Sequence, residues 1–203
     1  MSLYRFFKRL FDITVVLLLL PLALPLIALV SLFILLTMGR PVLFRQNRVG
    51  LHEKIFELYK FRTMMPAPNG DLRALTDAQR LTPVGKFIRK TSLDELPQLF
   101  NVLKGDMSIV GPRPLLDIYL PRYSETQKQR HFVPAGITGW AQINGRNTLD
   151  WSVRLEQDVW YVNNCSFLLD MKIIAGTIRC IFNTLETTQP GHATCEEFKG
   201  NQI

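Results

Sequence analysis

The sequence predicts an α+β fold that is mainly helical, with an N-terminal membrane helix over residues 1–39 and a compact domain over residues 40–203. Three observations carry this prediction. The run from Ile13 to Gly39 contains no charged side chain, and as a helix of about 40 Å it could cross a bilayer. Two β-prone segments then flank Asn47–Gly50, as in a hairpin. Prolines and glycines divide the remaining chain into short segments with helical spacing of apolar residues.

Composition excludes several classes of protein. The chain has 203 residues, 47% of them hydrophobic, and a net charge of +7. This apolar content argues against disorder and is enough for a sizeable core. Cys165, Cys180 and Cys195 are an odd, scattered set, which excludes a full disulfide framework and gives no zinc pattern. The excess of positive charge is compatible with binding to nucleic acid, to anionic lipid or to phosphorylated substrates.

The apolar N-terminal run has cations on both sides. Three precede it within residues 5–9, and three follow it within residues 40–48. Because cationic flanks tend to stay cytoplasmic, charge alone gives no preferred orientation. Pro21 and Pro25 lie near the middle, where each removes a helical hydrogen bond. A kinked, re-entrant helix that enters and leaves by the same face is consistent with both features; a single span with a proline kink is the alternative.

The compact domain begins with a predicted β-hairpin over Pro41–Met64. A polar loop at Pro66–Asp71 follows, and Pro112 and Pro114 break the chain again. Pro134–Asn147 is rich in glycine and polar residues, which predicts an ordered loop. Asp150 is the predicted N-cap of the helix that follows it. The last predicted helix, Phe167–Phe182, packs in the core or lies on a membrane surface. The predicted helices are Pro83–Lys90, Leu93–Leu103, Ser124–His131, Asp150–Asn163 and Phe167–Phe182.

Ser92-Leu93-Asp94-Glu95 is the strongest candidate for chemistry. It matches a capping box, in which Ser92 caps a helix and Glu95 reaches back to it. Pro97 fits that interpretation poorly because it would occupy the helix interior. In the other interpretation Asp94, near the positive end of a helix dipole, is an ionised nucleophile and Glu95 is its acid/base partner. Glycosidases also use paired carboxylates, so the pair alone does not identify a reaction.

Cations surround this pair in the sequence, and arginine in particular suits phosphate oxygens. Exposed surface charge is the alternative for most of them. Arg113 is less easily explained in that way because Pro112 and Pro114 fix its backbone. Carboxylates and arginines beside a membrane fit phosphate-group transfer, with the acidic pair acting directly or holding Mg²⁺. The candidate cations are Lys60, Arg62, Lys86, Arg89, Lys90, Arg113 and Arg146.

Taken in order, the motifs resemble those of the small monotopic phosphoglycosyl transferases, also called bacterial sugar transferases. The resemblance covers almost the whole chain. It is carried by Asn47–Gly50, Lys60–Met64, Ser92–Val102, Leu103–Ser108, Val110–Pro114 and Pro134–Trp140.

The resemblance implies a Mg²⁺-dependent transfer of a sugar-1-phosphate from a UDP-sugar to polyprenyl phosphate, with release of UMP. This would be the first membrane step of bacterial glycoconjugate synthesis. Asp94 matches the nucleophile that carries the phosphosugar and is the expected metal ligand, and Glu95 matches its partner. The family's helix breaks at a Ser-Pro pair, for which this chain has Leu24-Pro25. The expected substrate-binding residues are Lys60, Arg62, Arg89, Arg113 and Arg146.

The expected location is the bacterial inner membrane, with the catalytic domain facing the cytoplasm and interfacial amphipathic helices on membrane lipid. No nucleic-acid partner is expected, and the sequence does not indicate an oligomeric state. Similarity of Gly191–Cys195 to members acting on N-acetylated amino sugars favours such a donor. The alternatives are a glycosyltransferase that releases UDP and a non-catalytic, basic, membrane-tethered binding domain.

Overall fold

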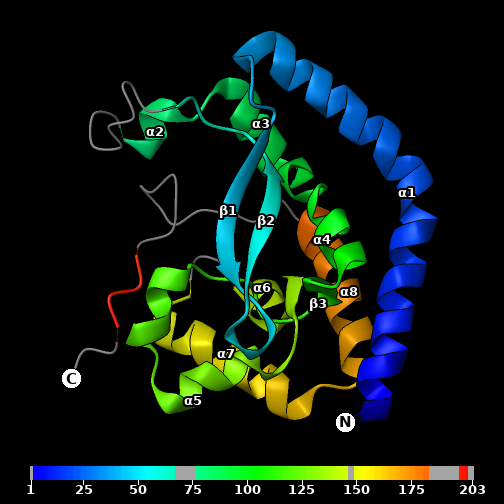
Figure 1. Cartoon of the computed structure of the whole chain (residues 1–203), viewed down its shortest axis with the longest axis vertical. Helices are drawn as coiled ribbons and strands as arrows, with labels where there is room; N and C mark the ends of the chain where they lie inside the picture. The colour runs from blue at the N-terminus through cyan, green and yellow to red at the C-terminus, as the bar shows by residue number, and fades with distance from the viewer. Residues whose placement is uncertain (1, 67–75, 146–148, 183–196, 201–203) are drawn as a thin grey trace.

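The computed structural model describes residues 2–66, 76–145, 149–182 and 197–200. It is mainly helical, with two small two-stranded sheets (Figure 1). The elements are α1 (Ser2–Met38), β1 (Leu43–Val49), η1 (Leu51–Glu53), β2 (Ile55–Phe61), α2 (Asp77–Arg80), α3 (Pro83–Lys90), η3 (Leu93–Glu95), α4 (Gln98–Lys104), β3 (Met107–Val110), η4 (Asp117–Arg122), α5 (Glu125–Lys128), η5 (Gln129–Phe132), β4 (Ala135–Thr138), α6 (Trp140–Ile143), α7 (Trp151–Asn164) and α8 (Phe167–Phe182).

Helix α1 is continuous through Pro21 and Pro25 and bends in its middle part (Figure 1). It is long and apolar enough to cross a membrane. One stripe of the helix, however, is buried against the rest of the chain at heptad-like spacing. The opposite side exposes leucines such as Leu18, Leu22 and Leu36, each about three-quarters accessible. The buried stripe comprises Val16, Ala23, Val30, Ile34 and Met38.

Polar contacts fix the N-terminal part of α1 to the compact domain. The Lys8 ammonium donates to Asp170 of α8 at 2.6 Å, and both side chains are buried. Asp12 accepts from the backbone N–H of Ile109 in β3 at 3.1 Å. The Arg9 guanidinium donates to the carbonyls of Val102 and Leu103 at the end of α4, where cations are favourable. Helix α1 is therefore part of the folded unit rather than a separate tether.

The predicted hairpin is confirmed as the antiparallel pair β1–β2, in register from Leu43 opposite Phe61 to Val49 opposite Ile55. The turn differs from the prediction, since Asn47 and Arg48 belong to β1 and the chain reverses at Gly50–Lys54.

Helix α4 is fastened to β2 by Asn101, which is fully buried. Its amide nitrogen donates to the Glu57 carbonyl at 2.7 Å, and its oxygen accepts from the Tyr59 N–H at 3.1 Å. Asn101 thus supplies two hydrogen bonds that a neighbouring strand would otherwise make. This fixes β2 relative to the segment that precedes α4.

Replacing Asn101 with alanine should leave both backbone groups of β2 without partners. Because a buried, unpaired polar group costs about 1–3 kcal/mol, we expect a loss of about 2–4 kcal/mol in the free energy of unfolding. Denaturant unfolding in detergent measures the change, with Asn163→Ala on the exposed side of α7 as the matched control. Equal stability of the two variants would contradict this role.

The second sheet was not predicted, because the segment beginning at Pro134 reads as a loop. Strands β3 and β4 pair in parallel, and the backbones approach closely at Gly111 after β3, at Gly136 within β4 and at Gly139 after β4. A Cβ on Gly136 would lie 2.1 Å from the Gly111 nitrogen, and one on Gly139 would lie 2.2 Å from the Gly111 oxygen. Only glycine permits this approach, which holds the Pro112–Pro114 loop in place.

Most of the other predicted elements are present. Helices α3 and α8 have the predicted bounds, and α7 is displaced by one residue. Asp150 has extended backbone before α7 but makes no side-chain capping bond. Residues 125–132 divide into α5 and η5, and residues 93–104 into η3 and α4. The predicted loop over Pro66–Asp71 lies outside the described residues except for Pro66.

Candidate active site

Asp94 and Glu95 lie beside two of the predicted cations. The Lys60 ammonium of β2 donates to Glu95 Oε1 at 2.8 Å and lies 3.6 Å from Asp94 Oδ2. Arg113, in the loop after β3, donates to the same Glu95 oxygen at 2.7 Å. The fold therefore brings together three segments that are far apart in the sequence. Each carboxylate side chain is less than one-fifth exposed.

The backbone at Ser92 turns the pair toward these cations. Ser92 has φ 57° and ψ 16° and makes no capping hydrogen bond, so the capping-box interpretation is wrong. The left-handed conformation costs a non-glycine residue about 1–2 kcal/mol, and such strain is common at functional sites. Leu93 and Leu96, on either side of the pair, pack with the C-terminal part of α1.

The two carboxylates have different electrostatic surroundings. Burial raises the pKa of Asp94, and Lys60 only partly offsets this effect while Glu95 adds to it. Burial also acts to raise the pKa of Glu95, but Arg113 and Lys60 outweigh it and hold that pKa well below its usual range. Glu95 is thus a firmly ionised anchor for the cations. Asp94 has no hydrogen bond within the described part of the chain, so its oxygens are not committed to a donor there.

Two further arginines lie around this cluster, Arg89 near Asp94 and Arg48 near Arg113. Arg89, in the last turn of α3, donates to the Thr63 hydroxyl at 2.9 Å. Burial lowers the pKa of Arg89, and the Asp94 charge partly offsets that shift. Arg48 of β1 was not among the predicted binding residues, although it stands in the Asn47–Gly50 motif. Burial, followed by repulsion from Arg113, lowers the pKa of Arg48 to about 10, so it stays charged at neutral pH.

Arg62 is not brought to this cluster. Its guanidinium donates to the carbonyls of Met38, Gly39 and Arg40 at 2.6, 2.6 and 3.1 Å. These are acceptors at the end of α1, whose last turn has no basic residue of its own. Arg62 thus ties α1 to β2, and its predicted substrate contact stays a prediction. Arg146 lies outside the described residues.

The acidic pair fits Mg²⁺ better than a metal that needs several protein ligands. Among the described residues, no group of three or more His, Cys, Asp or Glu side chains could hold a metal. Mg²⁺ is commonly held by one or two carboxylates together with substrate phosphates and water. Asp94 offers such a carboxylate, whereas Glu95 already accepts from Lys60 and Arg113.

Comparison with known proteins assigns the chain to a family. The profile described as "Bacterial sugar transferase" matches residues 3–184, which include every element from α1 to α8. The chain belongs to the bacterial sugar transferase family. The match includes the acidic pair and its cations, so the predicted family is confirmed.

Relatives within this family differ in length. The chain is 52% identical over 194 residues to the "Uncharacterized sugar transferase EpsL" of Bacillus subtilis, covering 96% of each protein. It is 40% identical to the "Undecaprenyl-phosphate galactose phosphotransferase" of Salmonella typhimurium, over 87% of this chain and 40% of that protein. It is 42% identical to the "UDP-glucose:undecaprenyl-phosphate glucose-1-phosphate transferase" of Escherichia coli, over 86% and 40% respectively. The names of the last two relatives state a substrate, and the chain spans less than half of each of them.

Proposed function

We propose that this bacterial sugar transferase moves a sugar-1-phosphate from a UDP-sugar to polyprenyl phosphate and releases UMP. The observation that carries the proposal is the unequal acidic pair. Glu95 binds Lys60 and Arg113, while Asp94 makes no hydrogen bond to any residue that the structure describes. The names of relatives that transfer sugar phosphates to undecaprenyl phosphate support the same class of acceptor. An N-acetylated amino sugar remains our preferred donor; the residues behind that preference, Gly191–Cys195, lie outside the described part.

The transfer requires two displacements at one phosphorus atom. An oxygen of Asp94 attacks the phosphorus attached to the sugar, the bond from that phosphorus to the UMP oxygen breaks, and UMP leaves. A phosphate oxygen of the lipid then attacks the same phosphorus, and the Asp94 carboxylate leaves unchanged. A covalent intermediate allows a soluble donor to depart before a lipid acceptor arrives.

The neighbouring cations suit the charge that develops in both steps. Lys60, Arg89 and Arg113 are positioned to stabilise negative charge on the transferring phosphoryl group. Glu95 fixes two of them and is a candidate to assist proton transfer. Mg²⁺ held at Asp94 would supply further neutralisation of the diphosphate.

The attachment of α1 along the domain supports a re-entrant rather than a spanning helix. The N-terminal part contacts β3, α4 and α8 through polar side chains, and the C-terminal part packs against α3 and η3. If α1 stood across the bilayer, the charged domain packed beside it would have to enter the hydrocarbon, which is costly. We therefore propose an inner-membrane protein whose catalytic domain faces the cytoplasm.

Cysteine labelling tests this topology. In a variant with the native cysteines replaced by serine, Leu3→Cys marks an exposed position at the start of α1 and Leu43→Cys one at the start of β1, shortly after α1 ends. Both should react with a membrane-impermeant maleimide in inverted vesicles and neither in intact cells. Reaction of the two positions from opposite sides would establish a span.

Trapping the intermediate tests the chemistry. Purified protein is incubated with Mg²⁺ and a UDP-sugar radiolabelled in the sugar, without lipid acceptor, and the modified peptide is mapped. We expect label on Asp94 and a stoichiometric burst of UMP. Lipid-linked product without any protein adduct would exclude the covalent route, and release of UDP in place of UMP would favour a glycosyltransferase. Absence of turnover with every UDP-sugar would favour the non-catalytic alternative.

A further inference from the structure

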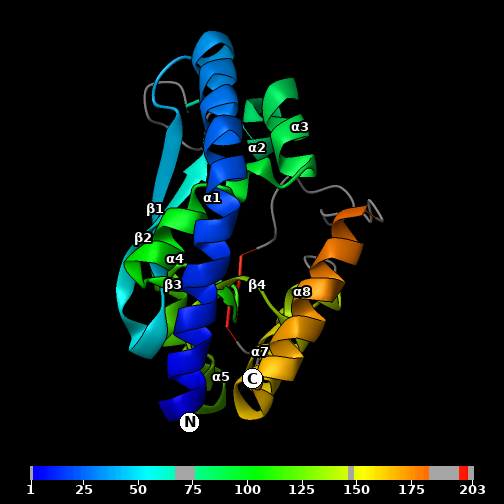
Figure 2. The ribbon, with the colours of Figure 1, turned by 90° about the vertical axis from the view of Figure 1, so that its right-hand side faces the viewer.

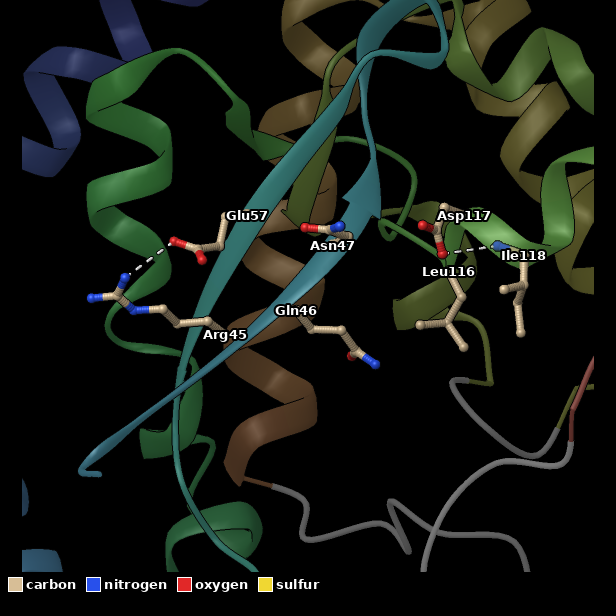
Figure 3. A pocket seen from close by; sticks show the side chains of 7 residues that line it. All are labelled: Arg45, Gln46, Asn47, Glu57, Leu116, Asp117 and Ile118. Carbon is tan, nitrogen blue, oxygen red and sulfur yellow. Dashed lines mark hydrogen bonds and ion pairs between the residues drawn. The ribbon is translucent and has the colours of Figure 1, made fainter. Parts of the chain in front are cut away.

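A polar hollow lies beside the free edge of β1, outside the acidic pair. Its volume is about 510 Å³, and it opens between the hairpin and the start of η4. Figure 3 shows Arg45 and Glu57 at one end, Asp117 and Ile118 at the other, and the two amide side chains between them. The lining residues are Arg45, Gln46, Asn47, Glu57, Leu116, Asp117 and Ile118.

A short series of contacts joins this hollow to the acidic pair. Gln46 accepts a hydrogen bond from Arg48 at 2.6 Å. Arg48 is close enough to Arg113 for their charges to interact, and Arg113 binds Glu95. Side chains alternate along each strand and paired residues share a face, so Gln46, Arg48 and Lys60 leave one face of the hairpin. The lining residues Arg45, Asn47 and Glu57 leave the other face. Gln46 and Arg48 therefore connect the hollow, around the edge of β1, to Arg113 and the acidic pair.

Arg48 brings a positive charge between the hollow and Arg113. Arg48 makes two hydrogen bonds, to Gln46 and to the Pro114 carbonyl, but no ion pair within the described residues. Its Nε is buried without a partner there. Asp117 lies close enough for its charge to act on Arg48, and Asp77 acts likewise on Arg89. A diphosphate can bind at Arg48, since arginine forks bind phosphate oxygens well.

The position of the hollow favours the water-soluble half of a substrate. Helix α1 packs on α4, α4 on β2, and β2 pairs with β1, so the hollow and the apolar outer side of α1 lie on opposite sides of these layers (Figures 1 and 2). A polyprenyl chain would approach from the side of α1. The hollow offers amides, two carboxylates and a guanidinium for a base edge and ribose hydroxyls, with Leu116 and Ile118 for apolar contact.

Resting on the proposed function, we propose that this hollow binds the uridine half of the donor, with the diphosphate crossing Arg48 and Arg113 to reach Asp94. Asn47 and Gln46 can each donate to and accept from the base. One Asp117 oxygen accepts from the Ile118 N–H at 2.9 Å, and the other can accept from a ribose hydroxyl. The hollow would therefore determine which nucleotide the enzyme accepts, independently of the sugar.

Binding of UMP to purified protein in detergent tests this site directly. Asn47→Ala and Asp117→Ala should each weaken UMP binding by about 10-fold, the effect of losing one useful hydrogen bond. They should also raise KM for the UDP-sugar, with kcat and the KM for the lipid acceptor nearly unchanged. Lys54→Ala, at the exposed hairpin turn, is the control and should bind as wild type does.

Crosslinking of wild-type protein provides evidence that does not depend on variants folding. Photolysis with 5-iodo-UMP should attach the base to a peptide containing residues 45–47 or 116–118, and crosslinks found only elsewhere would overturn the site. Wild-type UMP affinity in both alanine variants would also overturn it, while leaving phosphosugar transfer intact. If instead UMP binds in the hollow but the wild type transfers no sugar phosphate, the proposed function fails and the nucleotide site stands.

Discussion

Asp94→Asn should abolish sugar-phosphate transfer while leaving a protein at least as stable as the wild type at pH 7. The amide cannot act as the nucleophile, so we expect turnover to fall by about 10⁴-fold or more. Stability should not fall, because burial makes the ionised Asp94 carboxylate unfavourable in the folded state. The measurements are UMP release from a UDP-sugar and the unfolding midpoint in detergent.

The stability difference between Asp94→Asn and the wild type should change with pH in a definite direction. Because folding raises the pKa of Asp94, its contribution to stability is fully present below the unfolded pKa and is lost as the pH rises through the folded value. Asparagine does not titrate, so Asp94→Asn should gain stability relative to wild type as the pH increases over that window. Wild-type transfer should fall as the pH drops through the raised pKa. Turnover by the purified Asp94→Asn protein at the wild-type rate would exclude Asp94 as the nucleophile.

Glu95→Gln should reduce transfer and also destabilise the protein. Lys60 and Arg113 both bind one Glu95 oxygen, and the neutral amide would leave their charges poorly compensated. Removing one partner from a buried pair costs about 3–5 kcal/mol, and because Glu95 is 19% exposed, we expect about 2 kcal/mol. Loss of the arrangement around the phosphate, and of any proton transfer, should lower kcat by about 10²–10⁴-fold.

The pH dependence of Glu95 runs in the opposite direction. Folding lowers its pKa, so its stabilisation is present above the unfolded value of about 4.3 and is lost as the pH falls through the folded value. The stability difference between wild type and Glu95→Gln should therefore shrink in acid. The two variants form a matched pair, since each exchanges a carboxylate for an amide at adjacent positions. Equal changes in their stabilities would mean that the carboxylates have equivalent surroundings.

Local patterns predicted the helices and the hairpin because their causes are local. Helix α3 has the predicted bounds, and the structure shows Thr82 as its N-cap and Pro83 in its first turn, both of which are local signals. The apolar pattern of Phe167–Phe182 was likewise enough to predict α8, because it does not depend on distant segments. The acidic pair was identified by residue type and order. Its approach to Lys60 depends on β2 and η3 meeting, which is a property of the folded chain.

Features that depend on distant segments could not be predicted in this way. The parallel pairing of β3 with β4 joins two four-residue strands separated by η4, α5 and η5, and no periodicity marks it. Arg62 stands two residues from Lys60, yet its side chain reaches the end of α1, because buried carbonyls there need donors. The capping box predicted at Ser92 was wrong for a third reason. The sequence matches a common helix-start pattern, but the backbone of Ser92 is left-handed and its side chain caps no helix.

The buried stripe of α1 has a practical consequence for producing this protein. Val16, Ala23, Val30 and Ile34 complete the apolar clusters that also contain Phe56, Leu99 and Ile88. Cutting the chain after Gly39 would open those clusters to water and should yield an aggregating fragment instead of a soluble enzyme. Expression and purification should therefore keep the first helix and supply detergent or lipid from the moment of extraction.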